Sequence, residues 1–323
     1  MSEPVALGRV VCIVGPTASG KSALAGLVAK RLGSAIVSVD AMQVYRGMDV
    51  GTAKTPMGER GVPLLMVDVA DVTDDYSAQR FQRDARACVD GLLARGLVPV
   101  LCGGTGLYLD AVIDEMDFPA GVTGGERRQG YERIAAEGGA AALHGILAER
   151  DPASAALIHP NNVRRCVRAL EMLDGGVSYA RNNEGLRRRK PHYEPCVWAV
   201  SMPRERLYRR IDERVDMMFE AGLVDEVRGL AARGLNRSRT AGQAIGYKEV
   251  LSALAGEYSL DEARDEVKRR TRHYAKRQLS WLRRDGRARW VDVDELGADR
   301  ACELIVSDAR GDFDLDGTRK EEG

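Results

Sequence analysis

The sequence predicts an α/β protein in which a parallel sheet flanked by helices is interrupted by a helical insertion domain. Short apolar runs alternate with segments of helical periodicity over residues 1–117. This rhythm stops between 118 and 196, where charged helices dominate, and it returns from 197 to 310. The 323 residues are enough for one large core with such an insertion. We expect residues 311–323, which are acidic and poor in apolar side chains, to be a disordered tail.

Composition excludes several classes of protein. The six cysteines are scattered without a Cys-x-x-Cys pair, which indicates reduced thiols and argues against a disulfide framework or a zinc site. The four histidines are equally dispersed, so there is no transition-metal cluster in the sequence. Because no apolar run approaches membrane-spanning length and the first residues lack a signal-peptide pattern, we expect a cytoplasmic protein without a membrane partner. We also expect a monomer, although the sequence does not determine the oligomeric state.

The first predicted strand, residues 10–14, leads into a phosphate-binding loop. The loop has two glycines five residues apart followed by Lys and Ser, in the order Gly15-Pro16-Thr17-Ala18-Ser19-Gly20-Lys21-Ser22. A segment of helical periodicity follows at 23–32, and this strand, loop and helix order predicts a P-loop kinase-like fold. Backbone N–H groups and the helix N-terminus would bind a diphosphate or triphosphate. Lys21 would add positive charge, and the Ser22 hydroxyl could bind Mg²⁺. The alternative, a turn that merely contains glycines, fits the flanking strand and helix poorly.

The next predicted strand, residues 34–39, ends at Asp40. Ligands of open parallel sheets bind beyond the carboxyl ends of the strands, so we expect Asp40 near the bound phosphates. A carboxylate at this position is suited to accept a proton. Alternatively, Asp40 could cap a helix or bind a water molecule that is coordinated to magnesium. Residues 43–54 are rich in glycine and polar side chains and predict a loop over the site. We then expect a buried strand over 64–69 and a helix from 76 to 93.

A further apolar strand, 98–102, ends in Gly103-Gly104-Thr105-Gly106, where the backbone can approach a ligand closely. No acidic magnesium ligand follows this strand, which argues against a motor or switch nucleotidase. In the helical insertion, Arg164 and Arg168 are one turn apart and share a face.

The core resumes with a predicted strand at 197–202 and a helix from Arg204. Arg214 lies at the edge of that helix's apolar stripe, where a half-buried cation needs an anion, so it is a candidate clamp on the diphosphate. A snorkelling side chain or an internal salt bridge are the alternatives.

Positive charge is concentrated late in the chain. Residues 264–289 hold eleven Lys or Arg against three Asp or Glu, with aromatic side chains among them. This pattern is typical of a groove for a nucleic-acid backbone, although a solvated helix face has the same composition. A last strand is expected near 290–293.

Taken in order, these blocks resemble the bacterial tRNA dimethylallyltransferase (tRNA isopentenyltransferase) family. The resemblance spreads over residues 10–284. Beyond the phosphate-binding loop, it rests on Asp40-x-x-Gln43-x-Tyr45, Gly51-Thr52-Ala53-Lys54, Tyr76-Ser77, Gly103-Gly104-Thr105-Gly106-Leu107-Tyr108, Arg168-Ala169-Leu170-Glu171, Ile245-Gly246-Tyr247-Lys248-Glu249 and Ala275-Lys276-Arg277-Gln278.

The resemblance implies transfer of a dimethylallyl group from dimethylallyl diphosphate to N6 of the adenosine 3′ to the anticodon, with Mg²⁺ assisting. Asp40 would accept the N6 proton, Thr105 would lie near the reacting centre, and Lys21 and Arg214 would stabilise the departing diphosphate. The partner would be the anticodon stem-loop of tRNA. The implied tRNA contacts are Asp40, Ala41, Met42, Gln43, Thr105, Arg127, Arg164, Arg165, Arg168, Gln243, Gly246, Tyr247, Lys248, Lys276, Arg277, Gln278 and Arg283.

The chain departs from the family pattern in places. Ala41 stands where a serine is usual, Leu64-Leu65 replaces a His-His pair, and residues 174–189 lack the usual Thr-Gly pattern. Three other functions fit part of the sequence. An adenylate isopentenyltransferase would need neither the helical insertion nor the late basic block. A P-loop kinase of a small metabolite would use Asp40 as a base toward a hydroxyl. An RNA-binding module without catalysis would leave Lys21 and Asp40 without a purpose.

Overall fold

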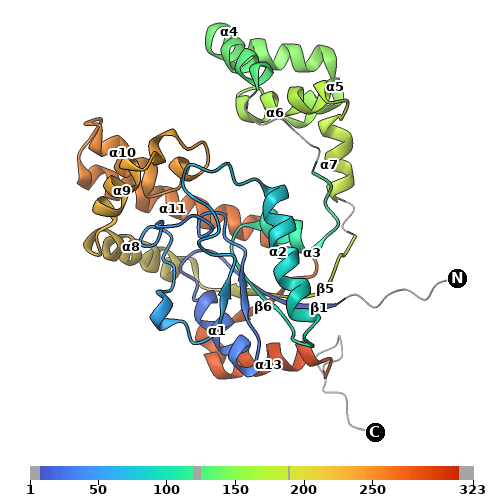
Figure 1. Ribbon diagram of the computed structural model, residues 1–323, viewed down its shortest axis with the longest axis vertical. Coiled ribbons are helices and arrows are strands. Elements are labelled where there is room, and N and C mark those ends of the chain that lie inside the picture. The colour runs from blue at the N-terminus through green and yellow to red at the C-terminus, as the bar shows by residue number, and fades with distance from the viewer. Residues whose placement is uncertain (1–7, 119–124, 188–189, 313–323) are drawn as a thin grey trace, which may run out of the picture. The chain divides into compact units, whose positions relative to one another are not determined.

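The computed structural model describes residues 8–118, 125–187 and 190–312, which form two compact units (Figure 1). The first unit contains the chain up to Ile113 and from His192 onward, and the second runs from Asp114 to Pro191. Strand β5 begins at Glu194, inside the range expected for the insertion, because it pairs along its length with the first strand. The expected tail at 311–323 lies almost wholly outside the described residues.

The first unit is built on a six-stranded sheet with the order β3-β2-β4-β1-β5-β6, in which every pairing is parallel. Strand β1 is central and fully apolar after its first residue, as a strand buried on both faces requires. Its register is fixed on both sides, since Val11 lies opposite Val100 of β4 and Cys196 of β5. The strands are β1 (Arg9–Val14), β2 (Ile36–Ser38), β3 (Leu64–Leu65), β4 (Val100–Gly103), β5 (Glu194–Ser201) and β6 (Arg289–Asp292).

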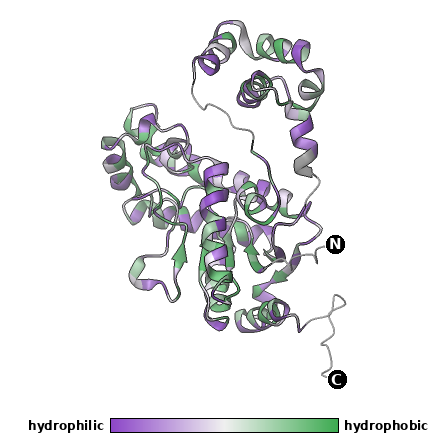
Figure 2. Ribbon diagram, turned by 45° about the vertical axis from the view of Figure 1, so that its right-hand side comes forward, coloured by the Kyte–Doolittle hydropathy of each residue, from purple (hydrophilic) through white to green (hydrophobic). Residues whose placement is uncertain are grey.

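Helices cover both faces of the sheet. Alternate residues of β1 point in opposite directions. Val10, Cys12 and Val14 therefore join the core beneath α2 (Ala78–Leu93) and α3 (Gly106–Ile113). Val11 and Ile13 join a second core with α1 (Lys21–Arg31) and α13 (Ala298–Arg310), which lie side by side in Figure 1. Figure 2 shows hydrophobic strands, and helices that alternate between hydrophobic and hydrophilic residues.

The remaining helices of the first unit follow β5 and β6. Helix α8 begins directly after β5, and α11 packs along it and along α10. These elements are α8 (Arg204–Glu220), α9 (Leu223–Ala232), α10 (Tyr247–Leu254), α11 (Leu260–Leu282) and α12 (Val293–Leu296), with short 3₁₀ turns η2 (Leu235–Arg237) and η3 (Ala241–Gln243). A further 3₁₀ turn, η1 (Met57–Glu59), lies between β2 and β3.

The second unit is helical and has its own core. Leu143 and Leu147 of its longest helix are fully buried against Cys166 and Leu170. Its elements are α4 (Glu126–Arg150), α5 (Pro152–Leu157), α6 (Val163–Asp174) and α7 (Tyr179–Arg187). Helix α4 is kinked at Gly139, whose φ of 79° interrupts the helical backbone.

Two parts of the first unit differ from the sequence-based expectation. The strand expected at 64–69 ends at Leu65, because Met66 and Asp68 have φ values of 61° and 57° that turn the chain. The Lys54 amine donates a hydrogen bond to Asp68 at 2.6 Å and holds this turn. Helix α13, which covers one face of the sheet, was not anticipated. Within the described ranges, no helix is both long and apolar enough to cross a membrane.

Candidate active site

Three sequence-predicted site segments meet at one edge of the sheet. The phosphate-binding loop follows β1, Asp40 comes two residues after β2, and Thr105 comes two residues after β4. The sheet order places β2, β4 and β1 side by side, and parallel strands end at the same edge. Segments that lie far apart in the sequence are therefore neighbours in the site.

The phosphate-binding loop has the backbone that an anion site requires. Gly20 has a φ of 90°, a left-handed conformation that glycine adopts without strain, and Lys21 begins α1 immediately after it. The Ser19 N–H donates to the Pro16 carbonyl at 3.3 Å, so the loop curls back on itself. The Lys21 amine also donates to the Pro16 carbonyl, at 3.1 Å. The loop and the start of α1 thus line cavities in which an anion could contact backbone N–H groups.

Lys21 and Arg214 are close enough to affect each other. Burial lowers the pKa of Lys21, and the nearby Arg214 cation lowers it further, while Cys102 and Asp40 act in the opposite direction. Burial also lowers the pKa of Arg214, and the Asp40 carboxylate opposes that shift. Two half-buried cations thus share one carboxylate. Such a site stabilises a further anion, because bringing one in restores charge balance where water is scarce.

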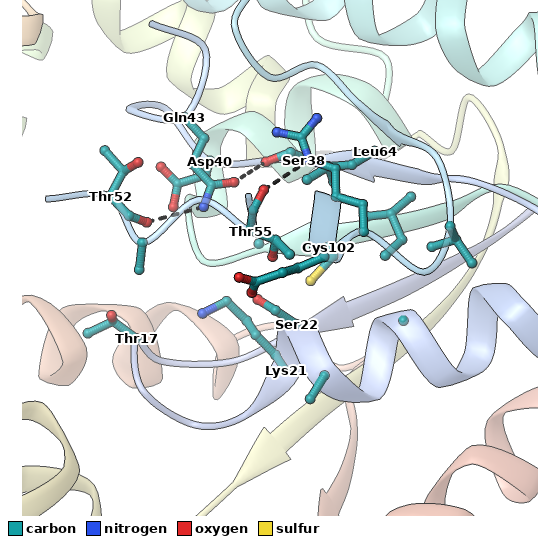
Figure 3. A pocket seen from close by; sticks show the side chains of 18 of the residues that line it. Thr17, Lys21, Ser22, Ser38, Asp40, Gln43, Thr52, Thr55, Leu64 and Cys102 are labelled. Carbon is teal, nitrogen blue, oxygen red and sulfur yellow. Dashed lines mark hydrogen bonds between the residues drawn. The ribbon is translucent and has the colours of Figure 1, made fainter. Parts of the chain in front are cut away.

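Asp40 lies opposite the phosphate-binding loop. In Figure 3, Lys21 and Ser22 rise from the start of α1 on one side of the cavity, and Asp40 and Gln43 reach in from the other. One carboxylate oxygen of Asp40, Oδ1, accepts the Met42 N–H at 2.9 Å, which orients the side chain. The carboxylate remains partly exposed to the cavity.

Two cavities meet at Asp40. The first, about 410 Å³, is lined by Thr17, Lys21 and Ser22 of the phosphate-binding loop and by Ser38, Gln43 and Cys102. The second, about 380 Å³, is lined by Ala41, Met42, Thr105, Arg277 and residues 243–247. The residues that border both are Thr17, Asp40, Thr52, Arg214 and Tyr274. Asp40 and Arg214 therefore face predicted diphosphate-binding residues on one side and several predicted tRNA contacts on the other.

Gln43 and Thr105 have partners within the site. The Gln43 amide accepts from the Ser38 hydroxyl at 2.9 Å and donates to the Thr52 carbonyl at 3.2 Å, as the dashed lines in Figure 3 show. Thr105 accepts the Ala41 N–H at 3.2 Å through its hydroxyl. Although Ala41 stands where the family usually has serine, its backbone N–H still contacts Thr105.

Tyr274 is a site residue that the sequence analysis did not single out. Burial raises the pKa of its phenol and the Asp40 carboxylate adds to the shift, while a hydrogen bond with Thr105 opposes it. Tyr274 therefore stands within reach of the two groups predicted to lie near the reacting centre. In the sequence, Tyr274 was visible only as an aromatic residue within the basic segment 264–289, a pattern that indicates a groove for nucleic acid and not a place beside Asp40.

Two predicted tRNA contacts have other partners in the structure. Gln278 is buried, and its amide joins the phosphate-binding loop to the loop after β4. Tyr247 is fully buried in the cavity wall, where its hydroxyl donates to Glu226 at 2.6 Å. Glu226, which the sequence analysis missed, also accepts the backbone N–H groups of Asp49, Val50 and Gly51. Gly246, next to Tyr247, is also buried.

The other predicted contacts of the first unit are accessible. Gln243, Lys276, Arg277 and Arg283 are exposed, and Lys248 is half-buried. The Arg277 guanidinium lies over the Tyr274 ring at 5.5 Å from its centroid. Many neighbouring cations of α11 are instead paired, since Lys268 contacts Asp216 and Arg272 contacts Asp212. Tertiary ion pairs thus reduce the free positive charge that the composition of 264–289 suggested.

The remaining predicted contacts belong to the second unit. Arg127, Arg164 and Arg165 are exposed, and Arg168 is half-buried. Asn162 caps α6 by accepting the Arg165 N–H, so Arg164 and Arg168 share a face of a regular helix.

Comparison with known proteins agrees with this geometry. The family model for IPP transferase matches residues 43–285, and the model for isopentenyl transferase matches residues 8–59. A tRNA dimethylallyltransferase of Streptomyces coelicolor is 47% identical over 90% of this chain and 92% of its own length. One of Geobacillus kaustophilus is 44% identical, with 90% and 92% covered.

Solved structures give the same result. The tRNA isopentenylpyrophosphate transferase of Bacillus halodurans is 40% identical, with a TM-score of 0.70 over 94% of this chain and 96% of that one. A eukaryotic dimethylallyltransferase acting on tRNA is 27% identical, with a TM-score of 0.78 over 98% and 81% of the two chains. From the matched family model and the extent of this similarity, we conclude that the chain belongs to the IPP transferase family, the family of the tRNA dimethylallyltransferases.

Proposed function

We propose that this protein transfers a dimethylallyl group from dimethylallyl diphosphate to N6 of adenosine 37, the nucleoside on the 3′ side of the tRNA anticodon, and releases diphosphate. The observation that carries the proposal is the position of Asp40 and Arg214 at the junction of two cavities. One cavity contains the phosphate-binding loop, and the other is lined by residues that the family resemblance assigns to tRNA. A reaction between two separately bound substrates needs binding sites that adjoin, with the reacting groups at the junction.

The first cavity suits the allylic diphosphate. The backbone of the phosphate-binding loop and the N-terminus of α1 would bind the diphosphate oxygens, with Lys21 and Arg214 adding charge. As the bond between C1 of the prenyl group and the diphosphate oxygen breaks, negative charge grows on the leaving group. Cations already fixed there stabilise that charge without having to reorganise.

Asp40 is suited to act as the general base. The exocyclic amine of adenine is a weak nucleophile because its lone pair is delocalised into the ring. As the new bond from N6 to C1 forms, N6 becomes more acidic, and the Asp40 carboxylate would accept its proton. Thr105 and Tyr274, which line the second cavity beside Asp40, would position the base.

Adenosine 37 would enter the second cavity after turning out of the anticodon loop, since a stacked base cannot reach a buried group. Exposed cations of α11 and the arginines of the second unit would hold the stem-loop through its phosphates. Binding to tRNA should therefore weaken steeply as salt is added. We propose a monomer as the active form.

The residues present are compatible with Mg²⁺ held mainly by substrate. Ser22 is an exposed residue in the first turn of α1, next to Lys21. Among the residues that the structure describes, no cluster of three or more His, Cys, Asp or Glu side chains could hold a metal. Mg²⁺ often keeps several waters and binds substrate phosphates, so Ser22 and the diphosphate form a suitable oxygen donor set. The ion would neutralise charge on the departing diphosphate.

Incubation with radiolabelled dimethylallyl diphosphate and a choice of acceptors tests the proposal. We expect label in tRNA, at adenosine 37 after nuclease digestion, and none in AMP. Label in AMP alone would identify an adenylate isopentenyltransferase. Hydrolysis or transfer of the ATP γ-phosphate without prenyl transfer would identify a kinase.

A further inference from the structure

A third cavity borders the phosphate-binding loop, and it opens to solvent because much of its lining, including Ser22, Arg206 and Arg209, is exposed. It has a volume of about 730 Å³ and runs between the loop and one face of α8. We call it the α8 groove; its α8 lining is Arg206, Arg209, Arg210, Glu213, Arg214 and Met217. It also shares Lys21, Ser22 and Arg214 with the first cavity of the active site. The groove therefore continues the diphosphate cavity outward.

The groove is strongly basic because of helical spacing. Arg206, Arg210 and Arg214 recur every four residues and so lie along one face of α8, with Arg209 beside them. Together with Lys21 they bring five cations to a cavity whose lining includes one carboxylate, that of Glu213.

Arg209 and Arg210 are the arginines of the α8 groove whose charge is available to bind an anion. Arg206 is paired with Asp294 at 3.0 Å, so its charge is already balanced. In the described part of the chain, neither Arg209 nor Arg210 has an ion pair with an acidic side chain. A Cβ atom built on Gly20 would lie 4.0 Å from Nη2 of Arg210. The Arg210 guanidinium thus reaches the loop at the residue before Lys21.

This arrangement is unfavourable for folding alone. Arg206, Arg210 and Arg214 are like charges spaced four residues apart on one helix, and such charges repel one another. Glu213 is about one turn away from Arg209 and Arg210, but in the described part of the chain it forms no ion pair with either. A cleft lined by one sign of charge instead raises the local concentration of ions of the opposite sign and speeds their binding. Planar guanidinium groups also match phosphate oxygens in bidentate contacts.

We propose that the α8 groove is an accessory binding site for diphosphate, in which Arg209 and Arg210 receive the anion on its way between solvent and the phosphate-binding loop. The groove would guide an allylic diphosphate inward and inorganic pyrophosphate outward. That an allylic diphosphate enters through the groove and pyrophosphate leaves through it rests on the proposed function. The affinity of the groove for a diphosphate anion does not. Arg209 and Arg210 do not reach the reacting atoms in this account and act only on the anion.

The test measures binding of inorganic pyrophosphate to the full-length chain by calorimetry, without tRNA. We expect the double variant Arg209→Gln/Arg210→Gln to bind about tenfold more weakly at low salt, and the difference to shrink as salt is added. Arg209→Lys/Arg210→Lys, which keeps both charges, should recover most of the affinity. The matched control is Arg228→Gln, because Arg228 is an exposed helical arginine of α9 paired with Asp225; its affinity should equal that of the unaltered protein.

Turnover separates this inference from the proposed function. If the double Gln variant binds pyrophosphate as tightly as the unaltered protein at low salt, the α8 groove is not a diphosphate site, whatever the reaction is. If the variant binds pyrophosphate more weakly but the unaltered protein transfers no prenyl group, the α8 groove is a diphosphate site and the proposed function is wrong. With both correct, the KM for dimethylallyl diphosphate should rise about tenfold in the variant, and inhibition by added pyrophosphate should weaken in parallel.

Discussion

Gln278 joins the C-terminal part of α11 to Thr17 in the phosphate-binding loop. Its Oε1 accepts the Thr17 N–H at 2.9 Å, and its Nε2 donates to the Gly104 carbonyl at 2.9 Å. A Cβ at position 104 would lie 2.1 Å from this nitrogen, so only glycine allows the approach. One buried amide thus ties together loops that follow two neighbouring strands.

Gln278→Leu should weaken both the fold and the anion site. It leaves the Thr17 N–H and the Gly104 carbonyl without their partner, a loss of about 1–3 kcal/mol in the free energy of unfolding. The phosphate-binding loop should also bind pyrophosphate less tightly, as measured by calorimetry, because Thr17 is no longer held. The exposed Gln129 gives a control variant, Gln129→Leu, that should change neither quantity. Unchanged stability and unchanged pyrophosphate affinity in Gln278→Leu would contradict this account.

Asp40→Asn should abolish prenyl transfer while pyrophosphate binding stays nearly intact. The amide cannot accept the N6 proton, and loss of a general base costs about 10²- to 10⁴-fold in rate. Single-turnover transfer to tRNA measures the first quantity and calorimetry the second. An Asp40→Asn enzyme with normal turnover would remove Asp40 from the mechanism.

Tyr247→Phe distinguishes a structural role from direct contact with tRNA. The hydroxyl is buried against Glu226, which also holds the backbone of residues 49–51. We expect the free energy of unfolding to fall by about 1–3 kcal/mol and the Kd for tRNA to stay the same. Chemical denaturation and filter binding provide the two measurements. Weaker tRNA binding by a variant of normal stability would place the hydroxyl in the interface.

Lys276 and Lys268 form a matched pair on α11. Lys276 is exposed, and within the described residues it has no acidic partner, whereas Lys268 contacts Asp216 at 2.6 Å. If Lys276 binds a tRNA phosphate, Lys276→Ala should reduce the slope of log K against log salt concentration by about one. Lys268→Ala should leave that slope unchanged. Equal slopes for all three proteins would exclude Lys276 from the phosphate contacts.

The lowered pKa of Lys21 predicts a pH dependence. Because burial and Arg214 lower this pKa, the amine loses its proton at a pH below its ordinary value of 10.5. Affinity for inorganic pyrophosphate should therefore fall as the pH rises through the alkaline range below that value. In Lys21→Arg the cation persists, and the fall should be smaller. Since both proteins bind the same ligand, ionisation of pyrophosphate cancels in the comparison; parallel pH profiles would contradict the assignment to Lys21.

The sequence by itself determined the strand, loop and helix around Gly15 to Ser22 and most of the sheet. A glycine-rich loop between an apolar strand and a helix is a local arrangement, so Gly15 to Ser22 could be recognised from neighbours in the chain. Asp40 and Thr105 were predictable because both follow apolar strands, and strands in a parallel sheet end at a common edge. Arg214 was predictable because a cation at the edge of a buried helical stripe needs an anion.

Only the tertiary structure decided which cations of residues 264–289 are paired with acidic side chains and which are unpaired. Whether a cation is free or paired depends on residues far away in the sequence, as with Lys268 and Asp216, and composition carries no information about such contacts. The same holds for Gln278, whose partners lie 261 and 174 residues away, and for Tyr247 with Glu226. The α8 groove was hidden for the same reason, because the four-residue spacing of its arginines became informative only when α8 packed beside the phosphate-binding loop.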